Sequence, residues 1–144
     1  MVERHRATGN IGVGLVKGFG LKKGAIASSI AHDSHNIIAV GTSDEDIFAV
    51  IKEIERLGGG LAVVAGGKVL ASLALPIAGL LSDEPLDVVV DRLERLEQLA
   101  RDLGSTLPLP FAPLFFLALP VIPEIRLTDL GLVDVNEFRL IERD

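Results

Sequence analysis

The residues best suited to chemistry lie together in the order His32, Asp33, Ser34, His35, Asn36. Two imidazoles, a carboxylate, a hydroxyl and an amide follow one another, and hydrophobic residues typical of β-strands flank them on both sides. Burying such side chains without partners is unfavourable, because each of them loses its hydrogen bonds to water. The cluster therefore needs either local hydrogen-bond partners or a ligand.

The sequence leaves three interpretations of this cluster open. It can be a structural corner, in which Asp33, Ser34 and Asn36 bond free backbone groups of a turn. It can face a ligand, with Asp33 orienting one histidine as a general acid or base. It can also hold a divalent metal ion through His32, His35 and Asp33, with His5, the remaining histidine of the chain, as a candidate further ligand.

Other familiar catalytic motifs are excluded by spacing or composition. The run Gly66-Gly67-Lys68 is not a phosphate loop, because position 62 is Ala62 and position 69 is Val69, where that motif needs glycine and Ser or Thr. Gly12-Val13-Gly14 is followed by Lys17, where the dinucleotide fingerprint needs a third glycine. The chain has no cysteine, which excludes a thiol nucleophile.

The pattern around the cluster predicts an antiparallel meander with the polar residues at its corner. A glycine-rich strand is expected over residues 10–20, with a backbone that bends or approaches another segment closely. Two further strands are expected over Ala25–Ala31 and Ile37–Val40. Gly66-Gly67 predicts a hairpin between strands over residues 61–65 and 68–75.

Two amphipathic helices are expected. The first is capped by Ser43 and ends at Gly58, and its apolar residues recur at helical spacing. The second is expected to begin at Ser82–Pro85 and to end near Leu103. Its predicted core stripe consists of Leu86, Val89, Val90, Leu93, Leu96 and Leu103.

The C-terminal part of the chain is different in composition. Five of the seven prolines fall within residues 106–123, which leaves room for one short helix near residues 112–118. Residues 127–141 carry a weak strand signal with a turn at residues 128–131. We therefore expect an α+β domain over residues 1–144: a mostly antiparallel or mixed β-sheet, two amphipathic helices packed on it and a proline-rich C-terminal segment.

Composition limits the partners. A net charge of −6 argues against a nucleic-acid surface, and we interpret Arg4, Arg6, Lys17, Lys22 and Lys23 as ordinary surface residues. Prolines and a Gly-Gly-Lys break interrupt the longest apolar runs, so no membrane span is expected. A mean hydropathy of +0.45 predicts apolar surface covered by another domain or another copy of the chain. The absence of cysteine fits a cytoplasmic protein, and the scarcity of thermolabile residues suggests a thermophilic source.

Four blocks of sequence together resemble the C-terminal domain of bacterial and archaeal adenine deaminases, members of the amidohydrolase superfamily. The blocks are residues 8–20, 24–36, 75–84 and 117–134, and the resemblance extends from about Glu3 to Val135. Such enzymes convert adenine and water to hypoxanthine and ammonia at a metal centre, with Mn or Fe expected, in an N-terminal barrel. This chain has no His-x-His pair and is too short for that barrel, which needs about 250 residues.

The resemblance implies a component of adenine deaminase that completes the active site of a barrel domain or subunit. In that case residues 32–36 face adenine or metal-bound water, and the isolated chain does not deaminate. A non-enzymatic module for purine binding or homo-oligomerisation is the alternative. A third hypothesis is a small metallohydrolase that uses His5, His32 and His35.

Overall fold

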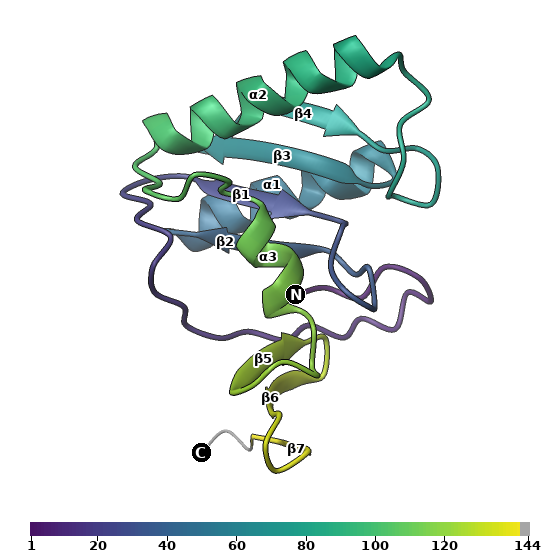
Figure 1. The fold of residues 1–144 in the computed structure, drawn as a ribbon, viewed down its shortest axis with the longest axis vertical. Coiled ribbons are helices and arrows are strands. Elements are labelled where there is room, and N and C mark those ends of the chain that lie inside the picture. The colour runs from purple at the N-terminus through teal and green to yellow at the C-terminus, as the bar shows by residue number, and fades with distance from the viewer. Residues whose placement is uncertain (142–144) are drawn as a thin grey trace.

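A computed structural model describes residues 1–141, which form two antiparallel sheets and three helices without a closed barrel (Figure 1). The expected α+β class is confirmed. The strands are β1 (Ala25–Ser28), β2 (Ile38–Gly41), β3 (Gly60–Ala65), β4 (Lys68–Ala74), β5 (Ile125–Thr128), β6 (Gly131–Asp134) and β7 (Arg139–Leu140). The helices are α1 (Asp44–Leu57), α2 (Leu86–Asp102) and α3 (Ala112–Leu117).

The larger sheet has the strand order β2-β1-β3-β4, and helices cover both of its faces. Alternate residues of a strand point to opposite faces, so each central strand contributes to two cores. Ala27 and Val64 pack with α1 on one face, whereas Ile26 and Val63 pack with α2 and α3 on the other. Figure 1 shows α1 behind this sheet and α3 in front of it. Burial on both faces explains why β1 and β3 are apolar along almost their whole length.

Helix α1 and the hairpin after it follow the local signals in the sequence. The hydroxyl of Ser43 accepts a hydrogen bond from the amide of Asp46, and Gly58 ends the helix at φ 73°. Gly66 and Gly67 join β3 to β4 with φ angles of 58° and 69°, which this tight hairpin turn requires. Both predictions are confirmed.

Helix α2 begins later than predicted. Its first residue is Leu86, and the hydroxyl of Ser82 instead accepts a bond from the amide of Glu84 within the preceding turn. A residue before proline is disfavoured in the helical region, so Pro85 keeps Glu84 out of the helix. The first part of the expected core stripe is exposed, with Leu86 at 78% and Val90 at 42%.

The prediction of a strand over residues 10–20 is wrong. Only Ile11 makes a bridge, to Val2, and the residues that follow it run without regular strand pairing. The predicted close approach is present: a Cβ placed on Gly12 would lie 1.8 Å from the carbonyl oxygen of Thr128. The β5–β6 turn therefore occupies the space beside this segment.

The C-terminal part contains the expected short helix, α3, followed by the small sheet β5-β6-β7 at one end of the molecule (Figure 1). The predicted turn joins β5 to β6, where the hydroxyl of Thr128 donates to the carbonyl of Gly131. Within residues 1–141 no helix combines the length and the apolar character that crossing a bilayer demands.

Candidate functional site

The predicted polar cluster forms the connection between β1 and β2. Asn36 is buried, His32 and His35 are half-buried, and Asp33 and Ser34 are exposed. The corner between these two antiparallel strands is therefore where the sequence places it, and four of its five polar side chains remain accessible at the surface. We call residues 32–36 the polar loop.

Short-range hydrogen bonds hold His35 in place. Its amide donates to the carbonyl of Ala31 at 2.6 Å, and the amide of Ala31 donates to Nδ1 of the His35 ring at 3.2 Å. Since Nδ1 accepts, the proton of the neutral ring lies on Nε2. His35 also has φ 49°, a conformation that few non-glycine residues adopt. The ring is thus fixed with an N–H available beyond the loop.

The two imidazoles of the loop are neighbours. The ring centroids of His32 and His35 lie 5.7 Å apart in an edge-on arrangement, and the His32 ring lies at the same distance from Phe116. The amide of His32 donates to the carbonyl of Phe115, so α3 supports this end of the loop.

The surroundings of His35 favour its neutral form. Burial lowers the pKa of His35, and the neighbouring His32 and Arg4 lower it further, against a smaller opposing effect of Asp33. At pH 7 the ring is therefore neutral, a hydrogen-bond donor at Nε2 rather than a cation. Asp33 is exposed, and within the described structure no hydrogen bond joins its carboxylate to either imidazole of the loop, so the orienting bond of the ligand-facing interpretation is not present.

The N-terminal segment clamps the polar loop from outside. Arg4 donates from Nε to the carbonyl of His35 and from Nη2 to the carbonyl of Ala78, both at 2.6 Å. Its amide donates to Oδ1 of Asn36 at 3.3 Å. His5 lies beside the loop, with Nε2 at 2.7 Å from the carbonyl oxygen of Ser34. All three histidines of the chain therefore gather around one loop.

Glu3 shapes this N-terminal segment. Its carboxylate accepts bonds from the amides of Thr8, Arg6 and His5, and these bonds, with that of Thr8 foremost, lower the pKa of Glu3 to about 2. A carboxylate ionised over the whole physiological range thus closes the turn that presents His5.

A second anchor comes from the β5–β6 turn. Oδ1 of Asp129 accepts from Nδ2 of Asn36 at 3.3 Å, and Oδ2 accepts from Nδ2 of Asn10 at 3.1 Å. One carboxylate therefore joins the polar loop to the N-terminal segment and to the small sheet. The buried Asn36 thus makes hydrogen bonds within the domain through both ends of its side-chain amide.

The metal interpretation finds no complete ligand set here. In residues 1–141 no three His, Cys, Asp or Glu side chains are placed to hold one ion. His5 uses Nε2 to bond a carbonyl, and His35 uses Nδ1 as an acceptor. The three-histidine hypothesis therefore gains no support from the arrangement of these residues.

Two residues that sequence reasoning missed hold the loop in place. The sequence alone indicates an ordinary surface residue at Arg4 and only a turn at Asp129. Their partners in the polar loop lie 31 to 93 positions away in the chain, so no local pattern signals the contacts.

Comparison with known proteins identifies the family. The family described as "Adenine deaminase C-terminal domain" matches residues 1–139. An adenine deaminase of Dehalococcoides mccartyi is 64% identical over 144 residues, which are 100% of this chain and 25% of that protein. "Adenine deaminase 2" of Carboxydothermus hydrogenoformans is 60% identical over 140 residues, or 96% of this chain and 25% of that protein.

A third relative, an adenine deaminase of Halalkalibacterium halodurans, is 55% identical over 144 residues, with the same 25% of its length covered. The chain thus spans about a quarter of the length of the curated relatives it matches. The family match over residues 1–139 and the 64% identity to one relative over 144 residues lead to the same conclusion: this chain belongs to the adenine deaminase C-terminal domain family.

Proposed function

We propose that this chain acts as the C-terminal domain of an adenine deaminase and that its polar loop completes the active site of the catalytic barrel. The observation that carries the proposal is the family match over residues 1–139, together with the accessible imidazoles of one anchored loop. The reaction would be the hydrolysis of adenine to hypoxanthine and ammonia.

The loop offers groups suited to a purine. Nε2–H of His35 can donate to a ring nitrogen, the exposed carboxylate of Asp33 can accept from an amino group, and the hydroxyl of Ser34 can do either. The Arg4 and Asp129 anchors reduce the freedom of the loop before a ligand arrives, which lowers the entropy lost on binding. In this proposal His35, Asp33 and Ser34 contact the substrate, and Arg4 and Asp129 position the loop.

The Mn or Fe of the proposed enzyme would belong to the barrel. Within residues 1–141, no three His, Cys, Asp or Glu side chains are placed to hold a metal ion.

The proposal is tested in a full-length chimera. The quarter of the Dehalococcoides relative that matches this chain is replaced by residues 1–144, and ammonia release from adenine is measured. Since the two sequences are 64% identical over the whole exchanged region, we expect an active enzyme. A folded chimera that binds its metal and does not deaminate would contradict the proposal.

The role of the loop is tested by His35 variants in that chimera. His35→Asn keeps an acceptor near the position of Nδ1 and tolerates positive φ, but it lacks the Nε2 donor. We expect kcat/KM to fall at least about tenfold, the effect of losing about 1.4 kcal/mol of interaction. Lys52→Ala, on the exposed side of α1, is the control and should leave the rate unchanged. Equal kcat/KM values for the two variants would show that His35 of the polar loop does not contribute to the active site.

The alternative function, an oligomerisation or binding module, is favoured by exposed apolar side chains at the outer strand of the large sheet. Val69 and Leu70 of β4 are 46% and 42% exposed, and Leu86 of the neighbouring α2 is 78% exposed. Sedimentation of the chain over a range of concentrations tests self-association, and calorimetry with adenine tests binding without a barrel. Tight binding by the isolated chain together with an inactive chimera would favour the alternative.

A further inference from the structure

The first three residues of the chain form the middle of a short β-ladder. Val2 exchanges two backbone hydrogen bonds with Ile37, at 2.7 and 3.0 Å, next to the outer edge of β2. On its other side, this segment exchanges two bonds between Met1 and Gly12, at 2.7 and 2.9 Å. Residues 1–3 therefore separate β2 from the segment that begins at Ile11.

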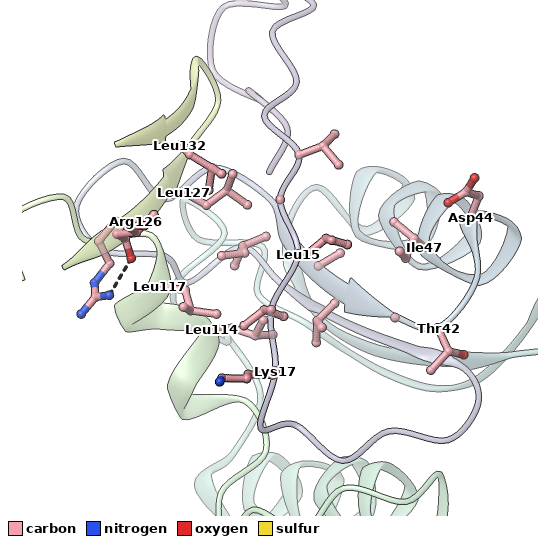
Figure 2. A pocket seen from close by; sticks show the side chains of 18 of the residues that line it. Leu15, Lys17, Thr42, Asp44, Ile47, Leu114, Leu117, Arg126, Leu127 and Leu132 are labelled. Atoms are coloured by element: carbon pink, nitrogen blue, oxygen red, sulfur yellow. Dashed lines mark hydrogen bonds between the residues drawn. The ribbon is translucent and has the colours of Figure 1, made fainter. Parts of the chain in front are cut away.

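A groove lies next to this ladder, at the end where a residue preceding Met1 would continue it. The groove has a volume of about 630 Å³ and lies between residues 38–44 on one side and residues 13–17 on the other (Figure 2). Leu114, Leu117, Leu127 and Leu132 add apolar side chains to its lining. Leu15 is fully exposed at 104%, although it is among the largest apolar side chains of the segment.

The register of the ladder defines what would occupy the groove. Antiparallel pairing of Val2 with Ile37 and with Ile11 places the first position upstream of Met1 between Ala39 and Val13. The third upstream position falls between Gly41 and Leu15. Ile37 directs its amide and carbonyl groups to Val2. Every second residue of a strand directs its backbone groups to the same side, so the amides and carbonyls of Ala39 and Gly41 also point into the groove. The groove thus presents the backbone edge of β2 to a strand in that register.

The amine of Met1 supports this reading of the groove. Met1 is only 7% exposed, and burial lowers the pKa of its amine to about 6, against an opposing effect of Asp129. A charged amine is costly at such a position, whereas a peptide N–H would make the same bond to Gly12 without a charge.

We propose that this groove receives an extended segment from the remainder of adenine deaminase, which continues residues 1–3 upstream and adds a strand between β2 and residues 13–17. The relatives supply such an occupant, since the chain covers only 25% of their length. The identity of the occupant rests on the proposed function, whereas its position and register are inferred from the ladder. Backbone pairing of this kind provides affinity, and alternate side chains reaching Leu117 and Ile47 provide selectivity.

The test extends the full chain. Six residues copied from the Dehalococcoides relative, immediately upstream of its matching region, are joined to Met1, and amide hydrogen exchange is measured by NMR. We expect exchange at Ala39 and Gly41 to slow by at least about tenfold relative to the unextended chain, because both amides gain partners. The same six residues are also added as a separate peptide, so that the result does not depend on folding of the extended chain.

The control is a matched extension with proline at the first and third upstream positions. Those two positions must donate to β2, and proline has no N–H, so we expect no protection. The inference would be overturned if the native and the proline extensions protected these amides equally. It would also be overturned if the native segment protected neither amide, whether joined to Met1 or added as a peptide. Protection of the unextended chain that grows with its concentration would also overturn it, by showing that a second copy fills the groove. An active chimera without protection at Ala39 and Gly41 would refute the added strand while leaving the proposed function intact.

Discussion

Removal of the Arg4 side chain is expected to destabilise the polar loop by about 2 kcal/mol. The guanidinium makes two charge-assisted bonds of 2.6 Å, to the carbonyls of His35 and Ala78. Bonds to charged groups contribute about 1.5–3 kcal/mol each when buried. The His35 bond is partly buried and takes the lower end of that range, about 1.5 kcal/mol. The Ala78 bond is exposed, so water replaces it in the variant and only about 0.5 kcal/mol is lost.

The assay is urea unfolding and thermal unfolding of the purified chain, both followed by circular dichroism, for wild type and Arg4→Ala. A loss of about 2 kcal/mol in a domain of this size corresponds to a fall of about 4–8 °C in Tm. Amide exchange at His35 should become faster in the variant, because the loop opens more often. Arg4→Lys keeps the charge but cannot bridge the two carbonyls in the same way, so we expect roughly half of the loss.

Arg92→Ala is the matched control. Arg92 forms an exposed ion pair with Glu84 at 3.3 Å, and such pairs contribute about 0–1 kcal/mol. If Arg4→Ala and Arg92→Ala unfold at the same urea concentration and exchange at His35 is unchanged, Arg4 does not anchor the loop.

Three further perturbations follow from the packing. Hydrogen bonds from Arg56 lower the pKa of the buried Glu53, so its carboxyl group binds a proton less tightly in the folded state than in the unfolded state. The free energy of unfolding should therefore fall as the pH drops below about 4.5, and Glu53→Gln should flatten this pH dependence in unfolding experiments. Gly12→Ala should cost about 1–3 kcal/mol or more, measured by urea unfolding, because the new Cβ overlaps the Thr128 carbonyl; an unchanged midpoint would contradict that contact. Leu114→Ala should cost about 2–5 kcal/mol in the same assay, since the side chain is 1% exposed, and a loss below about 1 kcal/mol would show that the core collapses around the gap.

The parts of the fold that were predicted correctly depend on signals within a few residues. The Ser43 cap, the Gly58 stop and the Gly66-Gly67 turn act locally, and so does the corner between β1 and β2. The late start of α2 also has a local cause. Pro85 keeps the residue before it out of the helical conformation, and this restriction outweighs the capping pattern that begins at Ser82.

The remaining features depend on contacts between distant parts of the chain. The glycine-rich segment has strand-like composition, but the turn at Thr128, more than a hundred positions later, lies against Gly12. The histidine corner was located from sequence, whereas its anchors were not, because Arg4 and Asp129 meet the loop only after the whole domain has folded. The metal, the cytoplasmic location, the oligomeric state and the thermophilic source stay predictions.

Asp129 also gives the domain a mechanical linkage. Its carboxylate ties the side chain of Asn36 to the turn of the small sheet, and Asn36 follows His35 directly in the chain. A displacement of the β5–β6 hairpin would therefore reach His35 through one hydrogen bond and one peptide unit. A domain that binds to the hairpin would shift the position of His35 without contacting it. The NMR resonance of the Asn36 side-chain amide would report that movement.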